Sequence, residues 1–154
     1  MSPGVVRLIT WNAAARSKRL VEQATAVAAR EPDIVAFQEV TRRTRPLWNR
    51  ALELMGLTHV LASSIDSGLS GGAVGRRTIV MIGARVALEE LEQPLLVPRR
   101  DSALSVRAWS SSGPLEIHCV HVPNAVNGWV KVETLQALRH GLETPSRVPR
   151  VLCG

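Results

Sequence analysis

The sequence predicts an α/β fold on three observations. Two mostly apolar runs, residues 5–12 and 33–39, have the length and composition of strands buried on both faces of a sheet. Residues 17–30 lie between them and carry apolar side chains at helical spacing, and Ser17 is a suitable N-cap. From residue 78 onward three more strand-like runs follow, so the first strand–helix–strand unit is expected to continue into a β-rich second part.

Two helices are expected in the first half of the chain. The apolar face of the first is predicted to comprise Leu20, Val21, Ala24, Val27 and Ala28. The second helix is predicted to begin near Pro46, a residue favoured in a first turn, and to end at Gly56. Its buried face is predicted to consist of Leu47, Trp48, Ala51, Leu52 and Met55.

The later elements follow from shorter signals. A short strand is expected over residues 58–62, and a Gly- and Ser-rich loop over 63–77. Further strands are predicted at 78–84, 103–109, 115–122 and 148–154, with a hairpin turn at 110–114. A third helix is expected to start at Asn127-Gly128 and to bury one face, which is made of Val132, Leu135, Leu138 and Leu142.

Length and composition indicate one soluble domain. The 154 residues are 45% hydrophobic and 21% charged, and no uncharged apolar run is long enough to cross a membrane. The N-terminus lacks the layout of a signal peptide, so a cytoplasmic location is expected. Cys119 and Cys153 lie in apolar strand-like runs, which predicts buried reduced thiols.

The net charge of +6 favours a polyanionic partner such as nucleic acid. All the basic residues except Lys18 and Lys131 are arginine, and a genome rich in G and C would produce the same skew. The aromatic residues do not predict a stacking surface, because there is no Tyr, one Phe and four separate Trp. Charge alone therefore leaves nucleic-acid binding open.

Polar side chains stand at the ends of the first two predicted strands. Asn12 ends the first run and Glu39 ends the second. If these strands are neighbours, the two side chains meet at one sheet edge and form an oxygen-rich corner that suits a hard divalent cation. Two plainer interpretations stay open: Asn12 can cap a turn, and Glu39 can form a surface ion pair with Arg42 or Arg43.

A later segment adds candidates of a different kind. His118 and His121 have an odd spacing, which on a strand sends them to opposite faces, so a shared metal site is not expected and His118 is interpreted as structural. The segment His121-Val122-Pro123-Asn124 is either part of a site or an ordinary turn after a strand. Lys131 near the start of the third helix is, taken alone, a solvated charge.

Taken together and in order, these motifs resemble the endonuclease/exonuclease/phosphatase superfamily, which includes the DNase I-like nucleases. The motifs are Ile9-Thr10-Trp11-Asn12, then Asp33–Glu39, then His121–Asn124, then Leu152-Cys153-Gly154. The resemblance implies a DNase I-like four-layer α/β sandwich, in which two facing mixed β-sheets are flanked by helices. It covers nearly the whole chain, residues 8–154, as a single but incomplete domain whose C-terminal part is missing.

The resemblance also implies roles for individual residues. Glu39 matches the metal-binding glutamate, with Asn12 beside it as a further metal-site and catalytic residue. His121 and Asn124 match catalytic positions at the scissile phosphate, and Asn124 and Lys131 fall where phosphate contacts are made. The implied cofactor is Mg²⁺, with Mn²⁺ as an alternative.

Departures from the family pattern bear on specificity and completeness. Ala14 stands where many DNA-repair members have an acidic residue, and residues 75–80 lack the pattern of typical exonuclease members. Members continue after Leu-x-Gly with Asp-x-Asn and later Ser-Asp-His, but this sequence stops at Gly154. The expectation is therefore a fragment or truncation that is inactive on its own.

The function expected of the full-length parent is Mg²⁺-dependent hydrolysis of phosphodiester bonds, with nucleic acid as the substrate. One alternative within the superfamily is a phosphatase or phospholipid phosphodiesterase that acts on a small phosphoester. Another is a non-catalytic module of the same fold that binds nucleic acid. No membrane partner is expected, and the sequence does not indicate an oligomeric state.

Overall fold

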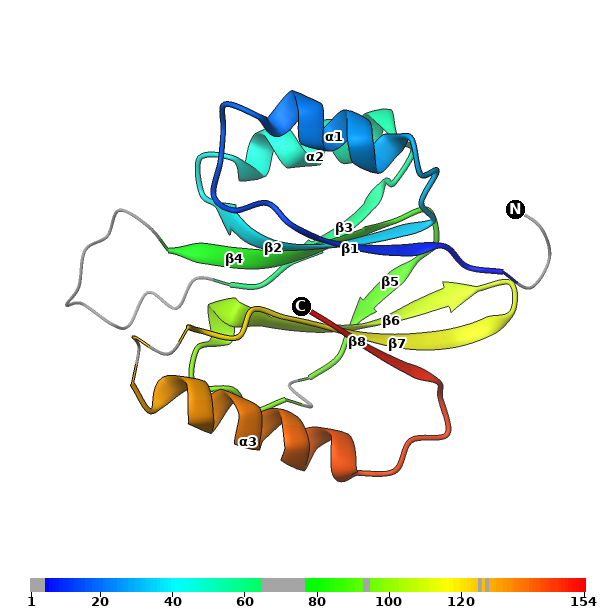
Figure 1. The fold of residues 1–154 in the computed structure, drawn as a ribbon. Helices are drawn as coiled ribbons and strands as arrows, with labels where there is room; N and C mark the ends of the chain where they lie inside the picture. Colours follow the sequence, from blue (N-terminus) through cyan, green and yellow to red (C-terminus); the bar gives the residue numbers. More distant parts are fainter. Residues whose placement is uncertain (1–4, 65–76, 93–94, 125, 127) are drawn as a thin grey trace.

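The computed structural model describes residues 5–64, 77–92, 95–124, 126 and 128–154. Two four-stranded mixed sheets face each other, and helices cover their outer faces, so the chain has four α/β/β/α layers (Figure 1). The predicted α/β sandwich is confirmed. The interior of the predicted loop, residues 65–76, and the predicted helix start at Asn127 lie outside the described residues.

The first sheet has the strand order β1-β2-β4-β3. Its strands are β1 (Leu8–Asn12), β2 (Ile34–Thr41), β3 (His59–Ala62) and β4 (Thr78–Ala84). Strands β1 and β2 are parallel neighbours connected by helix α1 (Leu20–Ala28), as the strand–helix–strand pattern predicts. Strand β4 is antiparallel to both β2 and β3.

The second sheet has the order β5-β6-β7-β8. Its strands are β5 (Leu88–Glu90), β6 (Ala103–Ser110), β7 (Gly113–Val120) and β8 (Arg150–Cys153). Strands β6 and β7 form the predicted hairpin, and β8 runs parallel to β7. A one-turn 3₁₀ helix, Arg100–Ser102, precedes β6.

Strand β2 is apolar along nearly its whole length because it is covered on both sides. Val35 and Phe37 pack against α1 and α2 (Arg45–Leu54), whereas Ile34 and Ala36 face the second sheet. The Phe37 and Trp48 rings, with centroids 4.3 Å apart, join β2 to α2. Helix α3 (Val130–Glu143) covers the outer face of the second sheet through Leu138.

The helices bury narrower faces than their periodicity predicts. Helix α1 begins at Leu20 rather than near Ser17, and no side chain caps it. Val21, Ala28, Leu47, Val132 and Leu135 were predicted to be buried, but all five are exposed. Each helix packs on a single sheet, so only the residues nearest that sheet are covered, such as Leu20 and Val27 in α1.

Candidate active site

Asn12 and Glu39 meet at the carboxyl ends of β1 and β2. The parallel register pairs Asn12 with Gln38, which places Glu39 one residue beyond this pair. The Asn12 side-chain amide donates a hydrogen bond from Nδ2 to Glu39 Oε1 over 2.8 Å. The expectation that the two side chains share one sheet edge is therefore confirmed.

A β-bulge in β2 turns Glu39 toward this edge. Phe37 pairs with Met81 and Val40 with Ile79, so two residues of β2, Gln38 and Glu39, lie opposite one residue of β4. Regular alternation would direct Glu39 to the same face as Phe37, into the apolar core under the helices. The bulge avoids this, and Glu39 adopts a left-handed backbone conformation with φ of +56°.

Gln38 points between the two sheets and connects them directly behind Glu39. Its Nε2 lies 3.0 Å from Thr10 Oγ1, 3.1 Å from Cys119 Sγ and 3.3 Å from the carbonyl oxygen of Ala36. The side chain is buried, so these contacts satisfy an amide that would otherwise be costly to enclose. One residue therefore ties together β1, β2 and β7.

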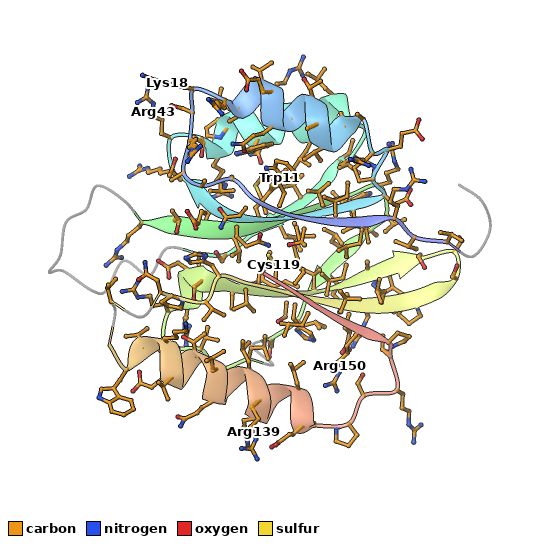
Figure 2. The ribbon with its side chains drawn as sticks, in the orientation of Figure 1. Trp11, Lys18, Arg43, Cys119, Arg139 and Arg150 are labelled. Atoms are coloured by element: carbon orange, nitrogen blue, oxygen red, sulfur yellow. The ribbon has the colours of Figure 1, made fainter. Side chains whose placement is uncertain are left out.

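Cys119 and Cys153 are free and buried, as the sequence predicts. They are register partners in β7 and β8, and Cys119 lies between the sheets (Figure 2). A hydrogen bond to Cys153 and burial together raise the pKa of the Cys119 thiol well above its ordinary value. Cys119 is therefore a neutral thiol that packs in the core and accepts a hydrogen bond from Gln38.

The second sheet contributes His121, which directly follows β7. Its backbone N–H donates to the carbonyl oxygen of Ser102 over 2.8 Å, which fixes the chain as it leaves the strand. Its Nδ1 lies 3.8 Å from Glu39 Oε1, and both side chains are about one-third exposed. Asn12, Glu39 and His121 thus form a solvent-accessible group of side chains built from both sheets.

The plainer interpretations of Asn12 and Glu39 have different outcomes. Asn12 does stabilise a turn, because its Oδ1 accepts a hydrogen bond from the backbone N–H of Ala14 over 2.7 Å. It therefore supports the loop and Glu39 at the same time. Among the described residues Glu39 forms no salt bridge with Arg42 or Arg43; the ionisable side chain beside its carboxylate is His121.

His118 is separate from this group, as its strand position predicts. It is buried, and its Nδ1 lies 2.8 Å from Ser105 Oγ on β6. Burial lowers the pKa of His118; nearby Glu116 opposes this effect, and Arg150 adds to it. A neutral, buried imidazole fits the structural role expected of it.

Asn124 and Lys131 lie on the connection from His121 into α3. Asn124 is exposed three residues after His121, and Lys131 is half-buried in the first turn of the helix. The fold brings this connection to the end of the molecule where β2 ends (Figure 1). Their phosphate-binding roles stay predictions.

Within the described residues no three His, Cys, Asp or Glu side chains are grouped so as to hold a metal ion. Glu39 is nevertheless suited to a hard cation that keeps most of its water ligands. Both of its side-chain contacts use Oε1, and Oε2 makes no hydrogen bond with a described residue. Mg²⁺ commonly uses one or two carboxylates with water ligands, whereas Zn²⁺ takes several protein ligands, and the identity of the ion stays a prediction.

Six exposed cations lie on the two segments of the chain that leave the first sheet at Asn12 and Glu39, and we call them the cationic rim. They come from the loop after β1 and from the segment that joins β2 to α2. The rim consists of Arg16, Lys18, Arg19, Arg42, Arg43 and Arg45. All six are exposed, and none forms a salt bridge with a carboxylate of the described residues; Lys18 and Arg43 lie at one end of the molecule (Figure 2).

Sequence reasoning gave Gln38 no role of its own, and of the rim it considered only Arg42 and Arg43, as ion-pair partners of Glu39. Gln38 was visible as an amide inside an apolar strand, a position that calls for buried partners. The rim was visible as two stretches, 13–19 and 40–52, that contain cations and no acidic residue. The second stretch follows Glu39 directly, and the fold brings the first stretch to it, where the backbone N–H of Ala15 donates to the Glu39 carbonyl oxygen over 3.0 Å.

The chain was also compared with known proteins. No protein-family model matches the sequence, and no curated protein sequence matches it significantly. None of the helices in the described part of the chain has the length and apolarity that a bilayer-spanning helix requires.

Solved structures do resemble it. One is an endonuclease/exonuclease/phosphatase from Beutenbergia cavernae, with 20% identity and a TM-score of 0.65 over 96% of this chain and 46% of that protein. An AP endonuclease from Archaeoglobus fulgidus has 21% identity and a TM-score of 0.66 over 97% of this chain and 56% of that one. An endonuclease/exonuclease/phosphatase family protein from Leptotrichia buccalis has 15% identity and a TM-score of 0.61.

The chain spans about half the length of the first two of these structures. Nearly all of its residues align with them, so the likeness concerns the whole arrangement of two sheets and outer helices. The chain therefore has the DNase I-like fold of the endonuclease/exonuclease/phosphatase superfamily.

Proposed function

We propose that this chain is part of a Mg²⁺-dependent phosphoesterase that hydrolyses phosphodiester bonds in nucleic acid. The observation that carries the proposal is the convergence of Asn12, Glu39 and His121 from two sheets on one accessible edge. Because the chain spans about half of the structures it resembles, the activity is assigned to a protein that also supplies the rest of the fold.

Glu39 is the proposed ligand for the divalent cation. Its carboxylate is held at Oε1 by the Asn12 amide, which leaves Oε2 exposed to a hydrated ion. Mg²⁺, when bound, would neutralise charge on the phosphoryl oxygens and lower the pKa of a bound water. Mn²⁺ is the alternative ion, since it prefers the same oxygen ligands.

The neighbouring residues are proposed to bind and orient the phosphate. The His121 imidazole can donate a hydrogen bond to a phosphoryl oxygen from the side of the second sheet, opposite Asn12. Asn124 and Lys131 would add a neutral and a cationic donor from the connection to α3. Asn12 keeps the Glu39 carboxylate in one orientation, which is a positioning role in addition to its proposed place in the metal site.

The cationic rim supports nucleic acid over a small phosphoester as the substrate. The six rim cations have no carboxylate partner among the described residues and exceed in number what a single phosphate group needs, whereas a polynucleotide presents a phosphate at every residue. Two of the similar structures are an AP endonuclease from Archaeoglobus fulgidus and the endonuclease domain of the retrotransposon TRAS1. ANGEL2, a 2′,3′-cyclic phosphatase, is also among the similar structures, so the likenesses do not separate a nuclease from a phosphatase and the choice of nucleic acid rests on the rim. The rim would serve a non-catalytic nucleic-acid-binding module equally, and the nicking assay distinguishes that alternative from the enzyme.

The test is Mg²⁺-dependent nicking of supercoiled plasmid DNA by the 154-residue chain and by any longer reading-frame product that contains it. Glu39→Gln keeps the size of the side chain and removes the charge that holds the cation. We expect the nicking rate of the active form to fall by about 100-fold or more. The affinity for Mn²⁺, measured by electron paramagnetic resonance on the 154-residue chain, should fall as well.

Glu31→Gln is the matched control. Glu31 is a glutamate with a similar left-handed backbone, φ of +49°, but it lies at the end of α1 with its side chain 85% exposed. It should change neither nicking nor Mn²⁺ affinity. Undiminished nicking by the Glu39→Gln protein would remove Glu39 from the metal site and, with it, the main support for the proposal.

A further inference from the structure

The most exposed tryptophan of the described residues lies at the start of α3, at the end of the molecule where β1 and β2 end (Figure 1). Trp129 is 77% exposed, although tryptophan is usually among the most buried residue types. It immediately precedes α3, on the connection that begins at His121. Its indole ring makes no hydrogen bond or ring contact with any residue that the structure describes.

The other three tryptophans each have a structural explanation. Trp48 is fully buried against Phe37, and Trp11 donates a hydrogen bond to Gln23. Trp109 is half-exposed, and the Arg107 guanidinium lies 5.9 Å from its ring centroid. Trp109 also lies near the β6–β7 turn, at the opposite end of the second sheet from the start of α3 (Figure 1).

The position of Trp129 relates it to the candidate site. In Figure 1, β1 and β2 end at the same end of the molecule at which β7 leads into α3. The cationic rim lies on the segments that leave the first sheet after Asn12 and Glu39, and Trp129 lies on the connection that leaves the second sheet after His121. The rim segments, the candidate site and the start of α3 are therefore at one end of the molecule (Figure 1), so a strand with a phosphate at His121 can extend toward either.

We propose that Trp129 is a base-stacking residue, which receives a nucleobase of a single-stranded segment whose phosphate lies at the Asn12–Glu39–His121 group. The inference rests on the proposed function, and it names the base as a second part of the substrate that is recognised besides the phosphate. An indole offers a flat apolar face to any base, so the contact distinguishes a nucleotide chain from a simple phosphoester without selecting a sequence.

A lipid surface is the other ligand that an exposed tryptophan could meet. Val126 on the same connection is exposed, and so are Val132 and Leu135 in the first turns of α3. These side chains would give a lipid surface some apolar contact, so vesicle binding is one outcome of the test. The rim, by contrast, offers cations suited to successive phosphates, so the charge distribution favours a polynucleotide.

The test measures binding rather than cleavage, in EDTA, with a fluorescently labelled 15-residue oligothymidylate followed by anisotropy. A second strand of equal length carries tetrahydrofuran abasic residues in place of the thymidines. Trp129→Ala should weaken binding of the thymidine strand about tenfold and leave the abasic strand unaffected, since only the first has bases to stack. The dependence of affinity on salt should stay the same, because no phosphate contact is lost.

Two variants accompany it. Trp129→Phe keeps an aromatic face and should retain most of the affinity, whereas Trp109→Ala removes an exposed indole elsewhere and should have no effect. The proposal is overturned if the native chain does not bind the thymidine strand, or if Trp129→Ala weakens binding of both strands equally or of neither. Loss of binding to phosphatidylserine vesicles, with strand binding intact, would overturn it in favour of a lipid surface.

The binding test of Trp129 and the nicking test of the proposed hydrolysis can fail independently of each other. Base-dependent binding through Trp129, with no plasmid nicking by the chain or by a longer product that contains it, would support a nucleic-acid-binding module and contradict the proposed enzyme. If nicking is lost in Glu39→Gln and thymidine-strand binding is unchanged in Trp129→Ala, the proposed enzyme is supported and only the stacking role of Trp129 is contradicted.

Discussion

Two glutamates, one in each sheet, show how differently this fold uses a carboxylate. Glu39 stands at the edge of the first sheet, bonds to the neutral amide of Asn12 and remains 30% exposed. Glu116 of β7 is nearly buried on the outer face of the second sheet. Its two oxygens contact Arg107 at 2.9 Å and Arg150 at 3.4 Å.

The difference separates a structural charge from an available one. Burial alone would raise the pKa of Glu116, but the guanidinium groups of Arg107 and Arg150 outweigh burial and lower it. Its charge is thus balanced within the protein, and no capacity is left for a ligand. Glu39 has no arginine partner among the described residues, so its charge is free to attract a cation from solution.

The largest effect on stability should come from Glu116→Gln, because Arg107 and Arg150 would lose the carboxylate that balances them. Removing one member of a buried ionic group costs about 3 kcal/mol in free energy of unfolding. Urea denaturation followed by circular dichroism measures it. The matched control is Glu53→Gln, which breaks an exposed pair with Arg50 at the same 2.9 Å and should cost less than about 0.5 kcal/mol.

A smaller effect on stability is expected from the protonation of His118, which lies beside Glu116. Burial lowers its pKa from the ordinary value of 6.5, so below that pH the unfolded chain binds a proton that the folded chain does not. Stability should be complete above pH 6.5 and decline as the pH falls toward the lowered value. Between pH 7 and pH 5, the midpoint temperature of thermal unfolding should therefore fall less in His118→Gln than in the native chain. An equal fall in both proteins would assign the pH dependence to other groups.

The smallest effect should appear at Glu39 itself. A glutamate with φ of +56° is strained, and glycine adopts this conformation without a Cβ clash. Glu39→Gly should therefore stabilise the fold by up to about 1 kcal/mol while it removes the proposed cation ligand. Glu31→Gly, at φ of +49°, should stabilise similarly without touching the site, and destabilisation of Glu39→Gly alone would show that the carboxylate supports the fold.

Much of the fold follows from local sequence, because β2 is covered on both faces and its apolar run reflects this directly. The pairing of Asn12 with Glu39 follows from the same logic, since parallel neighbours end at one edge. Strand β5 was not predicted, because Leu88-Glu89-Glu90 contains a single apolar residue and forms a strand only by pairing with β6. Its presence depends on a distant part of the chain.

The finer features of the site also depend on distant partners. The bulge at Glu39 is a mismatch between β2 and β4, whose sequences lie about forty residues apart, so neither strand reveals it alone. The exposure of Trp129 could not be predicted either, since an apolar residue before a helix is compatible with burial or exposure. These features arise from how the layers pack.

The hydrogen bond between Gln38 and Cys119 gives the molecule a built-in reporter of its own opening. Cys119 is fully enclosed between the sheets, and its raised pKa keeps it in the unreactive thiol form. A thiol reagent can therefore reach it only when the two sheets separate, and separation also breaks the contact behind Glu39. The alkylation rate of Cys119 therefore measures how often the two sheets separate behind the candidate site, and the measurement needs no introduced probe.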